Sequence, residues 1–130
     1  MRVLYVDDDR INTLLFVETC RVAGGFEVRS AASASEALLA VHDWAPDLLV
    51  IDLHLPDQSG YELLPALRSQ LQAPDLPAYL CTADDERQVQ TPARAAGFTG
   101  CWVKPVDLNI VLRVLAQLRG GLEDGPSASP

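Results

Sequence analysis

The stretch DLLVID, residues 47–52, decides the fold class of this sequence. It is an apolar run between two aspartates, and its lack of polar alternation indicates a central strand buried on both faces. Such strands are typical of parallel sheets that are covered by helices. The segment that follows, SGYELLPALRSQL (59–71), has the apolar spacing of a helix. Together the two segments predict one strand and helix unit of an alternating chain.

The same alternation continues in both directions along the chain. The predicted strands are residues 2–6, 26–31, 47–52, 77–83 and 101–104, and the predicted helices are residues 11–23, 33–44, 59–71, 84–97 and 108–119. Five strands that alternate with helices predict a parallel sheet with right-handed crossovers and helices on both faces. The expected fold class is therefore α/β.

Capping and breaking residues set the expected helix boundaries. Ser33 begins a capping box, and Asp107 and Gly120 are expected to cap the last helix in front and behind. Pro92 lies within the predicted helix 84–97, and we expect it to interrupt that helix because proline has no backbone N–H to donate.

The length and composition of the sequence predict one domain. The chain has 130 residues, of which 48% are apolar and 22% charged, enough apolar material for a single core. We expect this domain to occupy residues 1–120. The remaining segment, GLEDGPSASP (121–130), is rich in Gly, Pro and Ser and is expected to be a flexible tail or a truncated linker.

Charge and hydropathy narrow the class of partner. The net charge of −8 argues against nucleic acid and against an anionic membrane surface, and it suits a cation site. No run approaches the length of a membrane span, and the chain starts with a strand-like segment instead of a signal peptide, so we expect a cytoplasmic protein. Cys20, Cys81 and Cys101 have no metal-ligand or disulfide spacing and are expected to be buried free thiols.

Polar residues stand where the predicted strands end. Asp7, Asp8 and Asp9 follow the first strand, and Asp52, Thr82 and Lys104 end the third, fourth and fifth. Ligands of parallel sheets bind beyond the carboxyl ends of the strands. Singly, such residues are also common as helix starts or as solvated side chains. Jointly, crowded carboxylates repel one another and favour a bound cation, and oxygen ligands without His or Cys suggest Mg²⁺ or Mn²⁺.

Four motifs resemble the receiver domain of two-component response regulators, over residues 2 to about 119: LYVDDD, LLVIDLHLPDQSGYELL, CTAD and VKP. The resemblance implies a flavodoxin-like, doubly wound sheet of five strands in the order 2-1-3-4-5. It also implies a cis peptide bond before Pro105. The implied site residues are the phosphoacceptor Asp52, the switch hydroxyl of Thr82, the phosphate-contacting Lys104, and a metal site formed by Asp7, Asp8, Asp52 and the backbone oxygen of His54.

The resemblance also implies a function in phosphoryl transfer. Asp52 would take a phosphoryl group from a phosphohistidine of a sensor histidine kinase or histidine phosphotransfer protein, and the domain would then control a downstream partner that the sequence does not identify. Such a domain is a regulatory phosphoacceptor with only self-phosphorylation and self-dephosphorylation chemistry, and we expect a monomer or weak dimer. The motifs look most like receivers of hybrid sensor histidine kinases, and a single-domain regulator is the alternative.

Two departures from the family pattern keep other functions open. Cys101 occupies the position of the usual switch aromatic, and Trp102 is expected on the opposite face of its strand. With Pro92, this leaves a pseudo-receiver that binds proteins without phosphorylation as an alternative. A haloacid-dehalogenase-like phosphohydrolase is a weaker one, because the second Asp of that family is His54 here. The His54 side chain is expected to lie at the rim of the pocket and to shield the acyl phosphate from water.

Overall fold

The computed structural model describes residues 1–104 and 106–123. The expected cis peptide bond involves Pro105 and lies outside the described residues. Most of the tail expected at 121–130 lies outside them as well.

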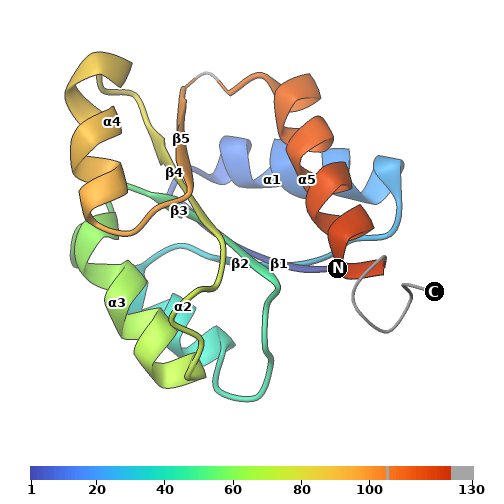
Figure 1. Cartoon of the computed structure of the whole chain (residues 1–130), viewed down its shortest axis with the longest axis horizontal. Helices are drawn as coiled ribbons and strands as arrows, with labels where there is room; N and C mark the ends of the chain where they lie inside the picture. The colour runs from blue at the N-terminus through green and yellow to red at the C-terminus, as the bar shows by residue number, and fades with distance from the viewer. Residues whose placement is uncertain (105, 124–130) are drawn as a thin grey trace.

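Five parallel strands form one sheet in the order β2-β1-β3-β4-β5, as expected (Figure 1). The elements along the chain are β1 (Arg2–Val6), α1 (Arg10–Ala23), β2 (Glu27–Ala31), α2 (Ala34–Ala40), β3 (Leu48–Asp52), α3 (Gly60–Leu71), β4 (Ala78–Thr82), α4 (Glu86–Ala95), β5 (Gly100–Val103) and α5 (Leu108–Glu123). The strand order reverses its direction between β1 and β3, which is the point where doubly wound sheets bind ligands.

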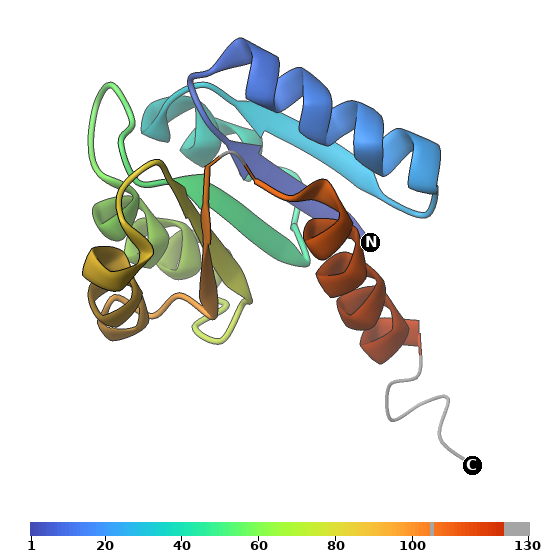
Figure 2. The same ribbon diagram turned by 90° about the horizontal axis from the view of Figure 1, so that it is seen from above.

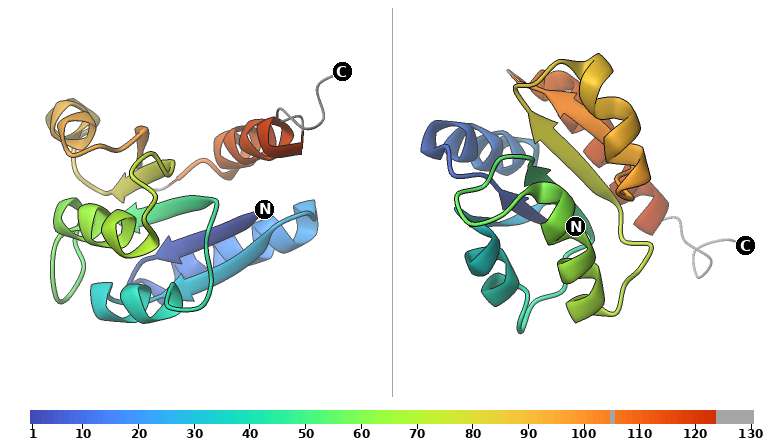
Figure 3. Two further views of the ribbon diagram at one scale, coloured as in Figure 1. Left: turned by 60° about the horizontal axis from the view of Figure 1, so that its bottom comes forward. Right: turned by 90° about the vertical axis from the view of Figure 1, so that its left-hand side faces the viewer.

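Helices cover both faces of the sheet and divide the core in two. Helices α2, α3 and α4 pack on one face, and α1 and α5 pack on the other, as Figures 2 and 3 also show from other sides. All five residues of β3 are buried: its four apolar side chains enter the two halves of the core in alternation, and Asp52 is buried at the carboxyl end of the strand. The prediction of a central strand buried on both faces is confirmed.

Helix α2 is shorter than expected. It ends at Ala40, not at residue 44, and Val41 leaves the helical conformation with ψ near zero. The reason is tertiary: the turn that follows takes Trp44 into the core, where the guanidinium groups of Arg2 and Arg29 lie 5.7 and 4.8 Å from its ring centroid. A helix continued to residue 44 would not leave the chain free to make this turn.

Helix α4 is continuous where an interruption was expected, and helix α5 is longer than expected. Helix α4 continues through Pro92 to Ala95, so the predicted interruption is wrong. Its Val89 and Ala93 are buried on one side, which offsets the loss of one hydrogen bond, and the Pro92 carbonyl still accepts from the Ala96 N–H at 2.9 Å. Helix α5 also passes the expected cap at Gly120 and ends at Glu123.

Two contacts fix the edge of the sheet where the strands begin. The Met1 ammonium donates to the Gly25 carbonyl at 3.0 Å, and the Arg119 guanidinium donates to the Gly24 carbonyl at 2.7 Å. The start of the chain and the last turns of α5 therefore lie near each other at the amino edge (Figure 1). The polar residues of the predicted site belong to the opposite edge.

Candidate functional site

The carboxyl edge of the sheet gathers the acidic residues predicted from the strand ends. Asp52 ends β3, and Asp7 and Asp8 directly follow β1. One carboxylate oxygen from each of these three residues lies within 4.8 Å of the others. Asp7 and Asp52 are buried, whereas Asp8 is exposed. Asp9 does not join them, because its side chain caps α1 by accepting from the N–H groups of the first turn.

Lys104 directly follows β5, and its side chain extends to the acidic cluster at the same edge of the sheet. Its Nζ lies 3.1 Å from Oδ2 of Asp7 and 3.0 Å from Oδ2 of Asp52. The backbone positions it, because the Lys104 N–H donates to the Thr82 carbonyl at 2.7 Å and so extends the β4 to β5 pairing. Burial lowers the pKa of Lys104, but the bonds to Asp52 and Asp7 outweigh burial and raise it. The ammonium therefore stays charged between the two carboxylates.

The two carboxylate oxygens of Asp52 have different partners. Oδ2 accepts from Lys104, and Oδ1 accepts from the His54 N–H at 3.2 Å. Burial raises the pKa of Asp52, Lys104 opposes this, and the nearby Asp7 adds to the rise. The cluster holds three carboxylates, and Lys104 pairs with only two of them, Asp7 and Asp52, so the pocket keeps an excess of negative charge that favours a cation.

The donor set fits a hard divalent cation. Asp7 has both oxygens engaged: Oδ1 accepts from the Asp9 N–H at 2.9 Å, and Oδ2 contacts Lys104 and accepts from the Tyr5 hydroxyl at 3.0 Å. The Asp8 side chain makes no hydrogen bond or ion pair with the described residues. Asp8 and Oδ1 of Asp52 are therefore better suited to direct contact with a metal, and Asp7 is better suited to contact through water.

Thr82 and His54 border this pocket and meet through Asp84. Thr82 ends β4, is fully buried, and accepts at Oγ1 from the Asp84 N–H at 3.0 Å. The exposed His54 side chain lies with Nε2 3.0 Å from Oδ2 of Asp84. Asp84 thus links the loop after β3 to the loop after β4. The sequence analysis did not predict a role for Asp84. The only signal for it was its position as the last residue of the CTAD motif.

The loop after β3 is also anchored from its far side. Both carboxylate oxygens of Asp57 accept hydrogen bonds at 2.9 Å, one from the Ala34 N–H and one from the Ser35 N–H in the first turn of α2. These bonds lower the pKa of Asp57. The segment between Asp52 and α3 is therefore held to α2 as well as to the sheet.

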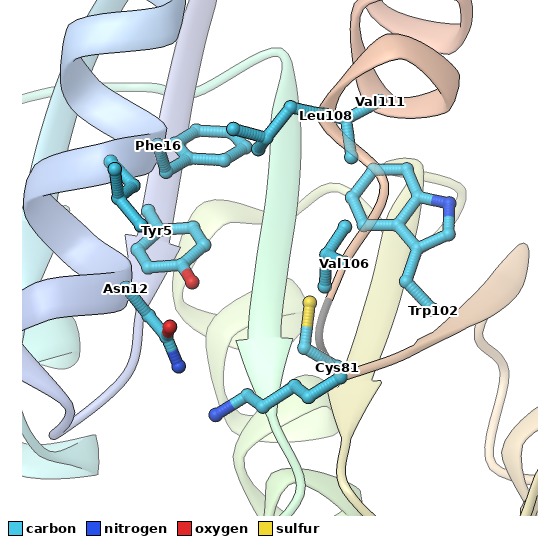
Figure 4. A pocket seen from close by; sticks show the side chains of 10 residues that line it. Tyr5, Asn12, Phe16, Cys81, Trp102, Val106, Leu108 and Val111 are labelled. Atoms are coloured by element: carbon cyan, nitrogen blue, oxygen red, sulfur yellow. The ribbon is translucent and has the colours of Figure 1, made fainter.

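A cavity of about 90 Å³ lies beside the pocket, on the face of the sheet covered by α1 and α5. Its walls are mostly apolar, with the polar side chain of Asn12 among those that Figure 4 labels. Lys104 lines it as well. Trp102 lines this cavity and stacks on Tyr79, with ring centroids 4.5 Å apart. Cys101 instead packs against the core under α2, α3 and α4. The prediction that these two neighbours face opposite sides is confirmed.

The described cysteines are free, as expected, although Cys101 is only partly buried. Burial raises the pKa of Cys20 to about 11, which makes its thiol unreactive at neutral pH. Within residues 1–104 and 106–123, no helix is both long enough and apolar enough to cross a membrane.

Comparison with known proteins agrees with the fold and with the motifs. The sequence matches the family model described as the response regulator receiver domain over residues 3–116. In solved structures, the chain is similar to the chemotaxis response regulator CheY4 of Vibrio cholerae, with a TM-score of 0.81 and 30% identity, covering 90% of this chain and 97% of that one.

Two curated relatives are longer proteins. The probable transcriptional regulatory protein TcrX of Mycobacterium tuberculosis is 35% identical over 118 residues, which are 90% of this chain and 49% of TcrX. The virulence sensor protein BvgS of Bordetella bronchiseptica is 33% identical over 135 aligned positions, which cover 98% of this chain and 11% of BvgS. The chain thus spans half or less of the length of these relatives. With the family model covering most of its residues, the chain belongs to the response regulator receiver domain family of two-component signalling.

Proposed function

We propose that this receiver domain accepts a phosphoryl group on Asp52 from a phosphohistidine of a sensor histidine kinase or a histidine phosphotransfer protein. The observation that carries the proposal is the environment of the Asp52 carboxylate. Lys104 holds its Oδ2 at 3.0 Å, while oxygens of Asp7 and Asp8 lie within 4.8 Å as sites for Mg²⁺, or Mn²⁺ in its place. A nucleophile, a fixed cation and a metal-binding cluster therefore share one pocket.

In the proposed step, an oxygen of Asp52 attacks the phosphorus of the phosphohistidine. The P–N bond breaks, the imidazole keeps the electron pair and takes up a proton, and an acyl phosphate forms on Asp52. Phosphoryl transfer needs mainly positioning and neutralisation of the equatorial oxygens. Lys104 supplies a flexible point charge at the acceptor. Bound at the carboxylates, Mg²⁺ would supply the remaining neutralisation.

We propose that Thr82 transmits the change. Its hydroxyl accepts from the Asp84 N–H, so its own proton remains available to a new acceptor. A phosphoryl group on Asp52 adds acceptor oxygens and negative charge next to β4. Rotation of the Thr82 hydroxyl toward these oxygens would pull the loop before α4 inward. Because Cys101 stands in the usual aromatic position, this loop would carry the output without an aromatic side-chain switch.

Helix α1 offers a docking face for the phosphodonor. It begins directly after the acidic cluster, and Ile11, Leu14 and Leu15 are 70, 59 and 53% exposed along it. Exposed apolar side chains beside an active site are typical of protein contact surfaces. A histidine-bearing helix laid against α1 would reach Asp52 over the rim. The similarity to BvgS and TcrX supports either a hybrid kinase or a separate regulator as the parent protein, and we place the domain in the cytoplasm as a monomer or weak dimer.

Labelling with acetyl phosphate tests the proposal. Wild-type protein with Mg²⁺ should gain one phosphoryl group by mass spectrometry, and hydroxylamine should remove it as expected for an acyl phosphate. Asp52→Asn should gain none, because an amide is not a nucleophile. Equal labelling of the mutant would refute the assignment of Asp52. A wild-type protein that never labels would be a pseudo-receiver, and rapid turnover of many phosphate esters would instead favour the phosphohydrolase.

A further inference from the structure

Tyr5 places a buried hydroxyl in the acidic pocket. It lies in β1 two residues before Asp7, so strand alternation puts both side chains on the same face of the sheet. The phenol donates to Oδ2 of Asp7 at 3.0 Å in a buried bond. The same oxygen contacts Nζ of Lys104 at 3.1 Å. Tyr5 is therefore in contact with the site through one specific carboxylate oxygen.

The Tyr5 ring is held rigidly. It stacks on Phe16 of α1 with ring centroids 4.3 Å apart and an interplanar angle of 16°. In Figure 4 its hydroxyl points away from Phe16, toward the end of the sheet at which the strand arrow ends, and the residue also lines the cavity under α1 and α5. Because the Tyr5 ring is fixed by stacking, its hydroxyl holds the Asp7 carboxylate in one orientation.

Asp7 needs such a constraint because its carboxylate torsion is otherwise broad. Three donors determine its plane: the Asp9 N–H at Oδ1, and Lys104 and Tyr5 at Oδ2. Lys104 is shared with Asp52 and, in the proposed function, shifts to the transferred phosphoryl group. Of the two side-chain donors, only Tyr5 would remain on Asp7 after transfer.

We propose that Tyr5 is a positioning residue that holds Asp7 in the orientation required for Mg²⁺ binding and phosphoryl transfer. This inference rests on the proposed function, because it assigns Tyr5 a role in that same site. Groups that orient metal ligands through hydrogen bonds typically change metal affinity or activity about tenfold to a hundredfold when removed. Tyr5→Phe keeps the stacked ring and removes only the hydroxyl.

Calorimetric titration with Mg²⁺ is the first measurement. Tyr5→Phe should weaken Mg²⁺ binding about tenfold and should slow acetyl phosphate labelling at saturating Mg²⁺. The matched control is Tyr79→Phe, since Tyr79 is also a stacked tyrosine on this face of the sheet but lies against Trp102. It should bind Mg²⁺ as wild type does. An equal loss in both variants would overturn the inference, because the effect would then be a general result of removing a tyrosine hydroxyl.

A double-mutant cycle with Asp7→Ala separates positioning from a general effect on stability. If Tyr5 acts through Asp7, adding Tyr5→Phe to Asp7→Ala should leave Mg²⁺ affinity unchanged. The same tenfold loss in both backgrounds would overturn the inference, as would wild-type affinity in Tyr5→Phe alone. A wild-type protein that binds no Mg²⁺ would refute the proposed function itself, and the role of Tyr5 with it.

Discussion

Replacing Lys104 with methionine should destabilise the metal-free protein strongly. Methionine keeps most of the apolar chain and removes only the charge. The Lys104 side chain is 18% exposed and contacts the buried Asp7 and Asp52. At 3.0 Å, one such pair is worth roughly 5 kcal/mol at an effective dielectric constant of about 20, before desolvation. Because removing one partner of a buried pair typically costs about 3 to 5 kcal/mol, we expect about 3 kcal/mol here.

The loss of stability in Lys104→Met should depend on pH in a defined direction. Loss of the ammonium would raise the pKa of Asp52 further, since burial already raises it and Lys104 opposes that rise. A carboxyl with a raised pKa in the folded state binds more protons than it does unfolded, so stability falls as pH rises from the unfolded pKa toward the folded one. The difference between wild type and Lys104→Met should therefore be larger at pH 7 than at pH 5.

Urea unfolding followed by tryptophan fluorescence, with EDTA and again with Mg²⁺, measures both effects. Mg²⁺ should stabilise Lys104→Met more than wild type, because the divalent cation then faces carboxylates without a competing ammonium. Arg21→Met is the control: Arg21 pairs with Glu18 on the exposed surface of α1, and its loss should leave unfolding unchanged. A Lys104→Met midpoint equal to wild type at both pH values would refute the reasoning.

Three further outcomes follow from the site. Asp8→Ala should abolish the Mg²⁺-dependent rise in melting temperature while leaving the metal-free protein as stable or more stable, since it removes a crowded carboxylate; an undiminished Mg²⁺ effect would exclude Asp8 as a ligand. Asp84→Ala should speed amide exchange in residues 83–88, because the link to His54 is lost; unchanged exchange would show that the link does not restrain the loop. Beryllofluoride should slow exchange in that loop and leave Trp102 fluorescence nearly constant, and a large fluorescence change would contradict output without an aromatic switch.

The sheet and the acidic cluster were predictable because both follow from local patterns. The unbroken apolar run at 48–51 required a strand buried on both faces, and parallel strands bring Asp7, Asp52 and Lys104 to one edge whatever the details of packing. Helix boundaries were less predictable, since they depend on distant partners. The end of α2 is set by the place of Trp44 in the core, and burial of α4 overrides the effect of Pro92.

The two functional contacts that were missed are side-chain contacts. Strand alternation places Tyr5 and Asp7 on one face, which would have suggested their bond if Tyr5 had been considered as more than core. The contact between Asp84 and His54 was harder to predict. It joins two loops that are far apart in the sequence, and the distance between them is known only once the chain is folded.

The positions of Met1 and the last turns of α5 affect how the domain can be built into longer proteins. Both lie at the amino edge of the sheet, where Gly24 and Gly25 hold them, whereas Asp52 lies at the opposite edge. Segments fused to either end would thus leave the pocket open to an incoming partner. To bring a phosphodonor on the same polypeptide to Asp52, a tether has to pass the full height of the strands, which requires at least about five extended residues. Tether length would then set how often donor and acceptor meet, independently of their contact surface.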